Sequence, residues 1–126
     1  MSDSDPLLAG KHMLVVDDEP LLAYDMADLL QLHGARIAGT CTSLDEAVAL
    51  IESGEAIDAA VLDIQVGNDE VWPCARRLRD RGIPFLFVSA LCGMRPLPAP
   101  FADRPFLGKP LDPLRLREAL RTLLGR

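Results

Sequence analysis

The sequence is poor in the residues that mark several common protein classes. Aromatic residues make up 5% of the 126 residues, and the three cysteines lie far apart without a Cys-x-x-Cys pair. The chain also lacks a basic surplus, since its formal net charge is −6. Isolated cysteines without neighbouring histidines argue against a zinc site or disulfide framework and favour free thiols in a reducing cytosol. An acidic chain argues against nucleic acid as a partner, because phosphate binding normally needs a basic face.

Long apolar runs are missing as well. The N-terminal stretch "MSDSDPLLAGK" has neither a basic start nor an apolar core, and no later segment is long enough to cross a bilayer. We therefore expect a cytoplasmic protein that has no membrane partner. Residues 1–10 are predicted to form a flexible leader and residues 11–126 a single domain, which suits a chain of this length.

What the sequence does contain is a regular alternation of short apolar runs and amphipathic segments. The predicted strands are residues 13–16, 36–40, 59–62, 85–88 and 105–107. The predicted helices are one ending near Gly34, one from the "SLDE" capping box to Gly54, one over 73–81 and one after Asp112. Continuous apolar strands separated by helices predict an α/β domain with a doubly wound, five-stranded parallel sheet.

One link departs from this alternation. Between the fourth and fifth strands, Pro96, Pro98 and Pro100 occupy alternate positions. Prolines so close together cannot lie inside one helix, because each removes a backbone donor and clashes with the preceding turn. The fourth helix is therefore predicted to be shortened or replaced by a proline-rich loop.

Polar residues follow the apolar strands at the points where the strands end. Asp17 and Asp18 follow the first strand, Asp63 the third, Ser89 the fourth and Lys109 the fifth. In a parallel sheet these positions share the carboxyl edge, where open α/β sheets bind ligands.

Three carboxylates at one edge repel one another, so a proton or a cation must relieve the repulsion. Mg²⁺ prefers such oxygen ligands, whereas zinc is disfavoured without cysteine or histidine. A carboxylate can also attack phosphorus to form an acyl phosphate, and a nearby lysine would neutralise the transferring group.

With these residues placed, the chain resembles a response-regulator receiver domain, the phosphoacceptor module of bacterial two-component signalling. The resemblance runs from about Lys11 to Arg126 and rests on "LVVDDEP", "AAVLDI", "FLFVSA" and "FLGKP". It implies the flavodoxin-like receiver fold. The segment "FVSALC" also resembles, with Cys92 in place of tyrosine, the Phe-Ala-Thr-Gly-hydrophobic-Tyr motif of an atypical stand-alone group that includes stress regulators.

The resemblance implies a role for each residue at the sheet edge. Asp63 would be the phosphorylated residue and a metal ligand. Asp18 would bind Mg²⁺ directly, Asp17 mostly through water, and the backbone carbonyl of Gln65 would complete the protein ligands.

The remaining implied roles concern the phosphoryl group and the response to it. Ser89 would donate a hydrogen bond to the phosphoryl group, and Lys109 would pair with it. Phe106 occupies the position of the switch aromatic, and the Lys109–Pro110 peptide is commonly cis in the family.

The function implied is that of a single-domain response regulator rather than an enzyme. It would accept a phosphoryl group on Asp63 from a histidine kinase or histidine phosphotransfer protein in a Mg²⁺-dependent phosphorelay. Because nothing follows the last helix, its effect would come through an unknown downstream protein. The phosphoprotein would thus act by changing how a partner binds.

Alternatives stay open at this stage. The altered loop after Asp63, in which Gly67-Asn68 makes a credible tight turn, leaves room for a degenerate receiver that binds partners without phosphorylation. An aspartyl-nucleophile phosphohydrolase is disfavoured because Gln65 stands where its general acid would be. A flavin carrier of this fold is disfavoured because "DDEP" would repel a phosphate.

Individual residues also have plainer interpretations. Asp17 and Asp18 could cap the first helix, and Phe106 could be an ordinary core residue. Trp72 is interpreted as packing at the start of a helix.

Overall fold

The computed structural model describes residues 7–90 and 97–125 and has at its centre a five-stranded parallel sheet. Its strands, in spatial order, are β2 (Arg36–Cys41), β1 (His12–Val16), β3 (Ala59–Asp63), β6 (Phe85–Ser89) and β7 (Phe106–Gly108). All four neighbouring pairs are parallel. The predicted fold class is therefore confirmed, and each strand boundary lies within one residue of its predicted position.

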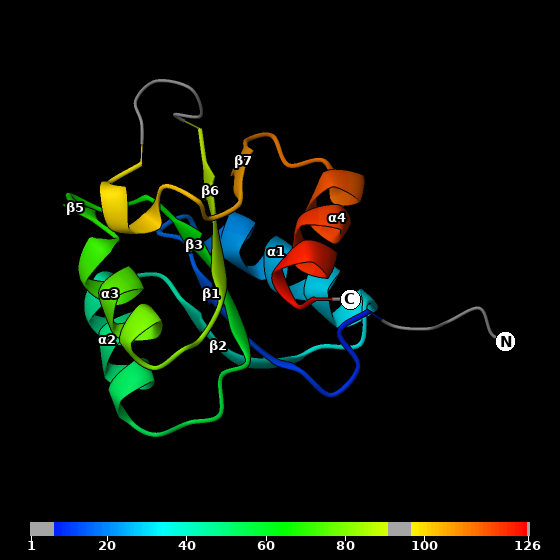
Figure 1. Ribbon diagram of the computed structural model, residues 1–126, viewed down its shortest axis with the longest axis horizontal. Helices are drawn as coiled ribbons and strands as arrows, with labels where there is room; N and C mark the ends of the chain where they lie inside the picture. The colour runs from blue at the N-terminus through cyan, green and yellow to red at the C-terminus, as the bar shows by residue number, and fades with distance from the viewer. Residues whose placement is uncertain (1–6, 91–96, 126) are drawn as a thin grey trace, which may run out of the picture.

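Helices cover both faces of this sheet (Figure 1). They are α1 (Pro20–Leu32), α2 (Leu44–Glu52), α3 (Trp72–Asp80) and α4 (Pro113–Leu123). Helices α2 and α3 lie on one face, and α1 and α4 lie on the other. Successive side chains of a strand point to opposite faces of the sheet, so each buried strand contributes apolar side chains to both faces. Both faces must therefore be covered by helices.

The two cores differ in the side chains that fill them. The α2/α3 side, which we name the aromatic side, contains Phe85, Phe87 and Phe101. The α1/α4 side, which we name the aliphatic side, contains Leu86 and Val88 from the same strand β6 and no aromatic residue among its described members. The alternation along β6 thus sends rings to one face and aliphatic groups to the other.

Side-chain caps fix the starts of two helices as the sequence predicts. The Ser43 hydroxyl accepts a hydrogen bond from the Glu46 amide at 3.2 Å, and the Glu46 carboxylate accepts one from the Thr42 amide at 2.9 Å. Asp112 accepts from the Leu114 amide at 2.9 Å. These bonds satisfy amide donors that have no partner within the helix, so α2 and α4 begin where the sequence places them.

The proline-rich link contains no α-helix over its described part, residues 97–105. A single 3₁₀ turn, η1 (Ala99–Phe101), lies here instead, and its Phe101 side chain is fully buried on the aromatic side. Cys92 and Pro96, which the sequence analysis singles out, lie outside the described residues. Over residues 97–105, the link therefore packs on the sheet mainly through the buried Phe101 ring, with Leu97 partly buried against the same core.

The predicted boundary of the N-terminal leader needs correction. Leu7 and Leu8 are buried against the aliphatic side, and the Leu8 amide donates to the His33 carbonyl at 2.8 Å. Burial of the adjacent side chains of Leu7 and Leu8 removes apolar surface from water and holds this part of the chain against the α1/α4 side. Packed structure thus begins by Leu7, four residues before the expected start of the domain at residue 11; residues 1–6 lie outside the described part.

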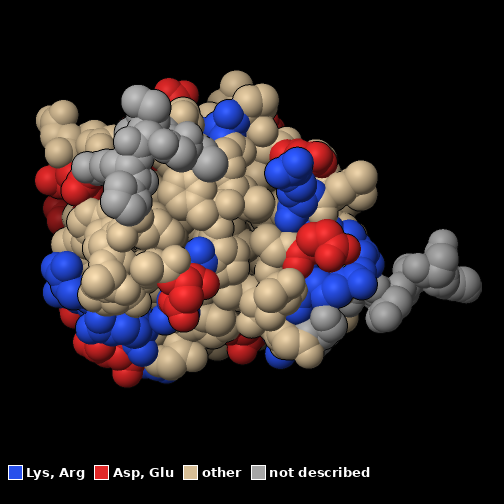
Figure 2. All heavy atoms as spheres, turned by 45° about the horizontal axis from the view of Figure 1, so that its top comes forward, with Lys and Arg blue, Asp and Glu red and all other residues tan. Residues whose placement is uncertain are grey.

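The surface carries charges of both signs. On the face drawn in Figure 2, lysine and arginine side chains lie next to aspartate and glutamate side chains. Among residues 7–90 and 97–125, no helix has the length and apolar content that a membrane crossing requires.

Candidate functional site

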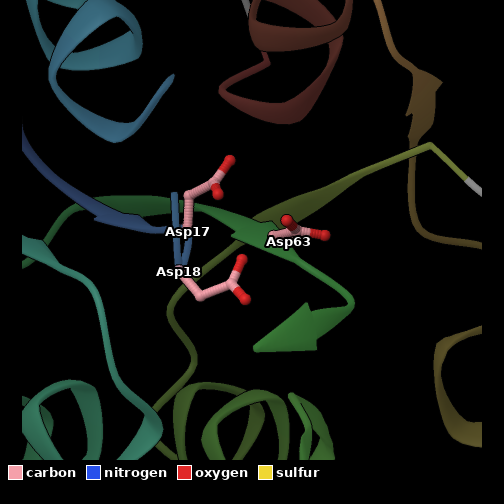
Figure 3. Close-up of side chains that lie close together, drawn as sticks. All are labelled: Asp17, Asp18 and Asp63. Carbon is pink, nitrogen blue, oxygen red and sulfur yellow. The ribbon is translucent and has the colours of Figure 1, made fainter. Parts of the chain in front are cut away.

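Three aspartates meet at the carboxyl ends of β1 and β3. Asp17 and Asp18 follow β1, and Asp63 is the last residue of β3. One carboxylate oxygen from each lies within 4.8 Å of the others, and Figure 3 shows the three side chains gathered at these strand ends. The chain thus brings together residues 46 positions apart because β1 and β3 are adjacent and in register, with Val16 opposite Leu62.

Lys109 completes this group from the far edge of the sheet. Its ammonium group donates to Asp17 Oδ2 and Asp63 Oδ2, both at 3.0 Å. Lys109 follows β7 and is held there by its own amide, which donates to the Ser89 carbonyl at 3.1 Å. The Lys109–Pro110 peptide bond is cis, as the resemblance implied.

The hydrogen bonds of the carboxylates distinguish the three aspartates. Both oxygens of Asp17 are engaged, one by Lys109 and the other by the Glu19 amide at 2.9 Å. Asp18 Oδ2 accepts from the Gly67 amide at 2.9 Å, and among the described residues its other oxygen takes no hydrogen bond. Asp18 therefore has an oxygen open to a cation, which favours it over Asp17 as a direct ligand.

The capping alternative for these aspartates is not what the structure shows. Helix α1 has Glu19 as its N-cap residue, and no side-chain oxygen caps it. Asp17 bonds to the Glu19 amide, which precedes the helix, and Asp18 bonds to the distant Gly67. Both side chains are thus directed to the acidic cluster and its surrounding loop.

A small hairpin follows Asp63 and forms one wall of the cluster. It consists of β4 (Gln65–Val66) and β5 (Asp69–Glu70), joined by Gly67 and Asn68. Gly67 has φ +64°, a conformation that only glycine adopts freely, so the predicted tight turn is confirmed. The Gln65 side-chain amide braces the turn by donating to the Gly67 carbonyl at 3.1 Å and the Asp69 carbonyl at 3.3 Å.

Ser89 ends β6, the strand next to that of Asp63, and Phe106 begins β7, the strand beyond it. In the register of β3 and β6, Asp63 pairs with Val88, so the buried Ser89 comes one residue beyond Asp63. Phe106 pairs with Phe87 across β6 and β7 and packs, half-buried, on the aromatic side. Ser89 thus lies at the strand end that carries the cluster. Phe106 lies farther from that end, at the start of β7, and packs on the aromatic side.

Burial and charge act together on the ionisable groups. The pKa of Asp63 is raised, first because burial disfavours its charged form and also because Asp17 is close by; Lys109 opposes the shift without cancelling it. Burial alone would lower the pKa of Lys109, but its hydrogen bonds to Asp63 and Asp17 outweigh burial and raise it. Lys109 is therefore firmly cationic, while the cluster as a whole keeps an excess of negative charge.

The donor set fits a hard divalent cation. Three carboxylates within 4.8 Å and a single ammonium group leave a net negative charge, which a bound cation would reduce. Oxygen is the ligand that Mg²⁺ prefers, and no cysteine or histidine belongs to the described cluster. Asp18 and Asp63 are the carboxylates that could hold such an ion, with Asp17 beside them; the Gln65 carbonyl stays a ligand that only the resemblance implies.

A pocket of about 580 Å³ opens beside the cluster on the aliphatic side. Asp17, Asp63 and Lys109 form part of its wall, and the rest is mainly apolar side chains of the strands and α1. Large exposed apolar residues of the described chain gather on the two helices of this side: Leu21, Leu22, Tyr24 and Leu32 on α1, and Leu114 on α4. An apolar surface of this kind marks a site of protein contact more often than a free surface.

Two features of this region escape prediction from the sequence. The Gln65 side chain is engaged in bracing the hairpin, and Trp72 does more than pack at the start of α3. The Trp72 indole N–H donates to Glu70 at 2.9 Å, and its ring stacks on Phe101 with centroids 5.8 Å apart. In the sequence, the tight turn at Gly67-Asn68 indicates a hairpin, but no pattern indicates that Trp72 would donate a hydrogen bond to Glu70.

Comparison with known proteins agrees with this architecture. The solution structure of SdrG from Sphingomonas melonis is 35% identical, with a TM-score of 0.79, over 98% of this chain and 99% of that one. A response regulator receiver protein from Sinorhizobium medicae is 28% identical, with a TM-score of 0.75, over 91% of this chain and 94% of the other. No family model matches the chain.

Curated relatives are longer than this chain. The phyllosphere-induced regulator PhyR of Methylorubrum extorquens is 29% identical over 75% of this chain but only 38% of its own length. The regulatory protein VirG of Agrobacterium fabrum is 23% identical over 95% of this chain and 53% of its own length. The chain thus spans about half or less of the curated relatives it matches.

A doubly wound sheet in the order β2-β1-β3-β6-β7, with aspartates and a lysine at its carboxyl edge, defines the receiver class of α/β domains. The chain belongs to the response-regulator receiver-domain family, and its relatives include PhyR-like regulators.

Proposed function

We propose that this receiver domain accepts a phosphoryl group on Asp63 from a histidine kinase or histidine phosphotransfer protein and signals through protein partners. The observation that carries the proposal is the placement of Lys109, 3.0 Å from both Asp63 and Asp17, inside a cluster of three carboxylates. A cluster of ionisable groups with shifted pKa values at the carboxyl edge of an open α/β sheet is a candidate functional site.

The proposed reaction moves one phosphoryl group between two side chains. An oxygen of the Asp63 carboxylate attacks the phosphorus of a phosphohistidine, the P–N bond breaks, and the histidine nitrogen keeps the electron pair. Lys109 faces Asp63 and would neutralise negative charge on the arriving group. Ser89 would donate a hydrogen bond to the product from the adjacent strand, with Phe106 as the candidate switch aromatic.

Mg²⁺ is the expected cofactor of this site. When bound, the ion would neutralise oxygens of the phosphoryl group during transfer. The chain's contribution is to position Asp18 through the Gly67 amide and Asp17 through the Glu19 amide.

The surface beside the site supports a protein as phosphoryl donor. Leu22 of α1 is exposed and lines the pocket together with Asp63 and Lys109, and Leu21 and Leu114 are exposed on α1 and α4, the two helices of that side. A small donor needs no such apolar surface, whereas a protein donor would bury it on docking. We therefore assign the α1/α4 side as the donor's approach.

Phosphoryl acceptance is tested with small donors and intact-protein mass spectrometry. The chain is incubated with acetyl phosphate or phosphoramidate and Mg²⁺, and it should gain one phosphoryl group. Asp63→Asn should abolish the gain, while Asp103→Asn, the same change at an exposed aspartate, should leave it intact. Failure of the native chain to label with either donor or with any histidine kinase would favour the degenerate receiver.

The hydrolase alternative predicts a different result. It requires sustained release of phosphate from many equivalents of a phosphomonoester, with a general acid two residues after the nucleophile. That position is Gln65, whose side-chain amide is too weakly acidic to protonate a leaving group and donates its N–H groups to the hairpin carbonyls. We therefore propose a signalling protein rather than an enzyme.

A further inference from the structure

The β4–β5 hairpin connects the acidic cluster to the proline-rich segment through a continuous series of hydrogen bonds and a ring contact. At its near end, the Gly67 amide holds Asp18 Oδ2 at 2.9 Å. The Gln65 amide, from the first residue of β4, points to Asp63 Oδ1 at the longer distance of 3.4 Å. The hairpin thus touches two of the three carboxylates through backbone donors.

The hairpin is also braced along its length, so a displacement at its turn is carried to its base. The Gln65 side chain spans the turn, and the Val71 amide donates to the Ile64 carbonyl at 2.8 Å, which closes the base. Ile64 and Val71 are both buried. A short ladder with a braced turn and a buried base moves as one unit more readily than an open loop does.

Trp72 joins the base of the hairpin to the far segment. Its indole N–H donates to Glu70 of β5 at 2.9 Å, and its ring stacks on Phe101 at 5.8 Å with 13° between the ring planes. Phe101 is 1% exposed and lies in η1, where a fourth helix would otherwise be. The indole therefore bonds to one element with its polar edge and contacts the other with its face.

We propose that the hairpin and Trp72 position Asp18 for cation binding and couple that binding to the Ala99–Phe101 segment. Trp72 is then a positioning residue of the site, acting through Glu70, the hairpin and Gly67. Binding of a cation by Asp18 changes the hydrogen bond between Asp18 and the Gly67 amide, and the hairpin shifts in response. The stacked rings of Trp72 and Phe101 then carry this shift to η1. The proposal rests on the metal-binding part of the proposed function and is independent of phosphoryl transfer.

Coupling of this kind is reciprocal, which makes it measurable from both ends. If Mg²⁺ binding alters the surroundings of Phe101, then loosening the Trp72 contacts must alter the affinity for Mg²⁺. The size expected for a change along a coupling route is about 2- to 30-fold in the dissociation constant. Trp72→Phe removes the N–H donor and keeps a ring, so it should fall at the low end. Trp72→Leu removes both contacts and should fall at the high end.

The experiment titrates the full chain with Mg²⁺ and follows backbone amide chemical shifts. In the native chain, the amides of Gly67, Phe101 and Ala102 should move with one common dissociation constant. In Trp72→Leu, Gly67 should still move, at a weakened affinity, while Phe101 and Ala102 stay in place. Since Trp72 is the sole tryptophan, its fluorescence in the native chain gives a second readout, which Asp18→Asn should abolish.

Leu86→Ala is the matched control for general destabilisation. Leu86 is fully buried on the aliphatic side of β6, the opposite face of the strand from Phe87, which contacts Trp72. The control should lose stability but keep the Mg²⁺ affinity and the Phe101 response. Equal weakening in Leu86→Ala, or an unchanged Phe101 response in Trp72→Leu, overturns the coupling.

The outcomes also separate this proposal from the proposed function. A native chain that binds Mg²⁺ and shows the coupled response, yet takes no phosphoryl group, sustains this proposal and refutes phosphoryl acceptance. A chain that labels on Asp63 but shows no Mg²⁺-linked change at Phe101 sustains phosphoryl acceptance and refutes the coupling. Absence of Mg²⁺ binding in the native chain contradicts both.

Discussion

On one face of the central sheet, aromatic rings fill the space beneath the helices, whereas on the other face aliphatic side chains border an open pocket. The Phe87 ring contacts the rings of Trp72, Phe85 and Phe101 at centroid distances of 5.5, 5.4 and 6.0 Å. Its neighbour Val88, one position along β6, lines the pocket of about 580 Å³ beside Asp63. The same strand therefore serves two different purposes on its two sides.

The difference shows how the described part of the link between β6 and β7 packs on the sheet without an α-helix. The aromatic side needs large rings because η1 contributes one buried side chain, Phe101, where a helix would contribute several. The aliphatic side leaves Leu21 75% exposed and Leu32 80% exposed on α1, which suits a surface that a partner covers. Packing on the first face and access on the second are thus separated by the sheet.

The largest effect should come from removing a ring on the aromatic side. Phe87→Ala is expected to lower the free energy of unfolding by about 3–5 kcal/mol, because it leaves a cavity where four rings meet. Val88→Ala, on the pocket side of the same strand, should cost about 1–2 kcal/mol. Urea denaturation measures both, and equal losses would contradict the difference between the two sides.

The reactivity of the two buried thiols on the aromatic side, Cys41 and Cys74, gives the next test. Burial raises the pKa of Cys41 from 9.0 to about 11 and that of Cys74 from 9.0 to about 12. Below pH 9 these shifts reduce the thiolate fraction by about 100-fold and 1,000-fold respectively, because each pKa unit is a factor of ten. In a Cys92→Ser background at pH 8, a disulfide reagent should react with the folded chain at least 100-fold more slowly than with the chain in urea. Rapid labelling of the folded chain would show that this side is open.

Lys109→Met tests the charge balance at the border of the two sides. At pH 7 without Mg²⁺, the loss should be about 1–3 kcal/mol, because Asp63 and Asp17 lose the cation that neutralises them. Since the fold favours protonated Asp63, the variant should regain stability as the pH falls from 7 towards the usual carboxyl range.

In the native chain stability also falls as the pH rises, and Lys109 adds a second pH window at the alkaline end. The raised pKa of Lys109 contributes stability that is present below pH 10.5 and is lost as the pH rises through the folded value. Thermal melts across pH 5–11 distinguish the two proteins, and a variant whose stability does not depend on acid pH would contradict the assigned ion pairs.

The smallest effect on stability should come from the exposed surface of the aliphatic side. Leu21→Gln is expected to change the free energy of unfolding by less than about 0.5 kcal/mol. Labelling by acetyl phosphate should be unchanged, whereas transfer from a protein donor should slow several-fold, because the donor loses apolar contact. A variant that slows both donors equally would place Leu21 in the chemistry rather than in docking.

The sequence predicts the sheet and its acidic edge because both follow from local patterns. Apolar runs such as Met13–Val16 lie in β1, and a parallel sheet necessarily brings the residues after its strands to one edge. That is why Asp17, Asp63 and Lys109 could be grouped before any coordinates, although they are 46 and 92 positions apart in the chain.

What the sequence could not supply depends on side-chain direction over long distances. The burial of Leu7 and Leu8 requires the space that the His33 turn leaves open, and Trp72 meets Phe101 only because η1 folds back over α3. The bracing by Gln65 likewise depends on a rotamer inside the hairpin. Periodicity identifies which elements form but not which of their polar groups meet.

The most direct test of the central claim is to locate the phosphoryl group on the chain. After labelling with acetyl phosphate and Mg²⁺, sodium borohydride reduces an aspartyl phosphate to homoserine, and tandem mass spectrometry of the peptides identifies the position. The account predicts homoserine at Asp63 alone, with none when Mg²⁺ is chelated. Homoserine at another aspartate, or stoichiometric labelling of Asp63→Asn, would contradict it.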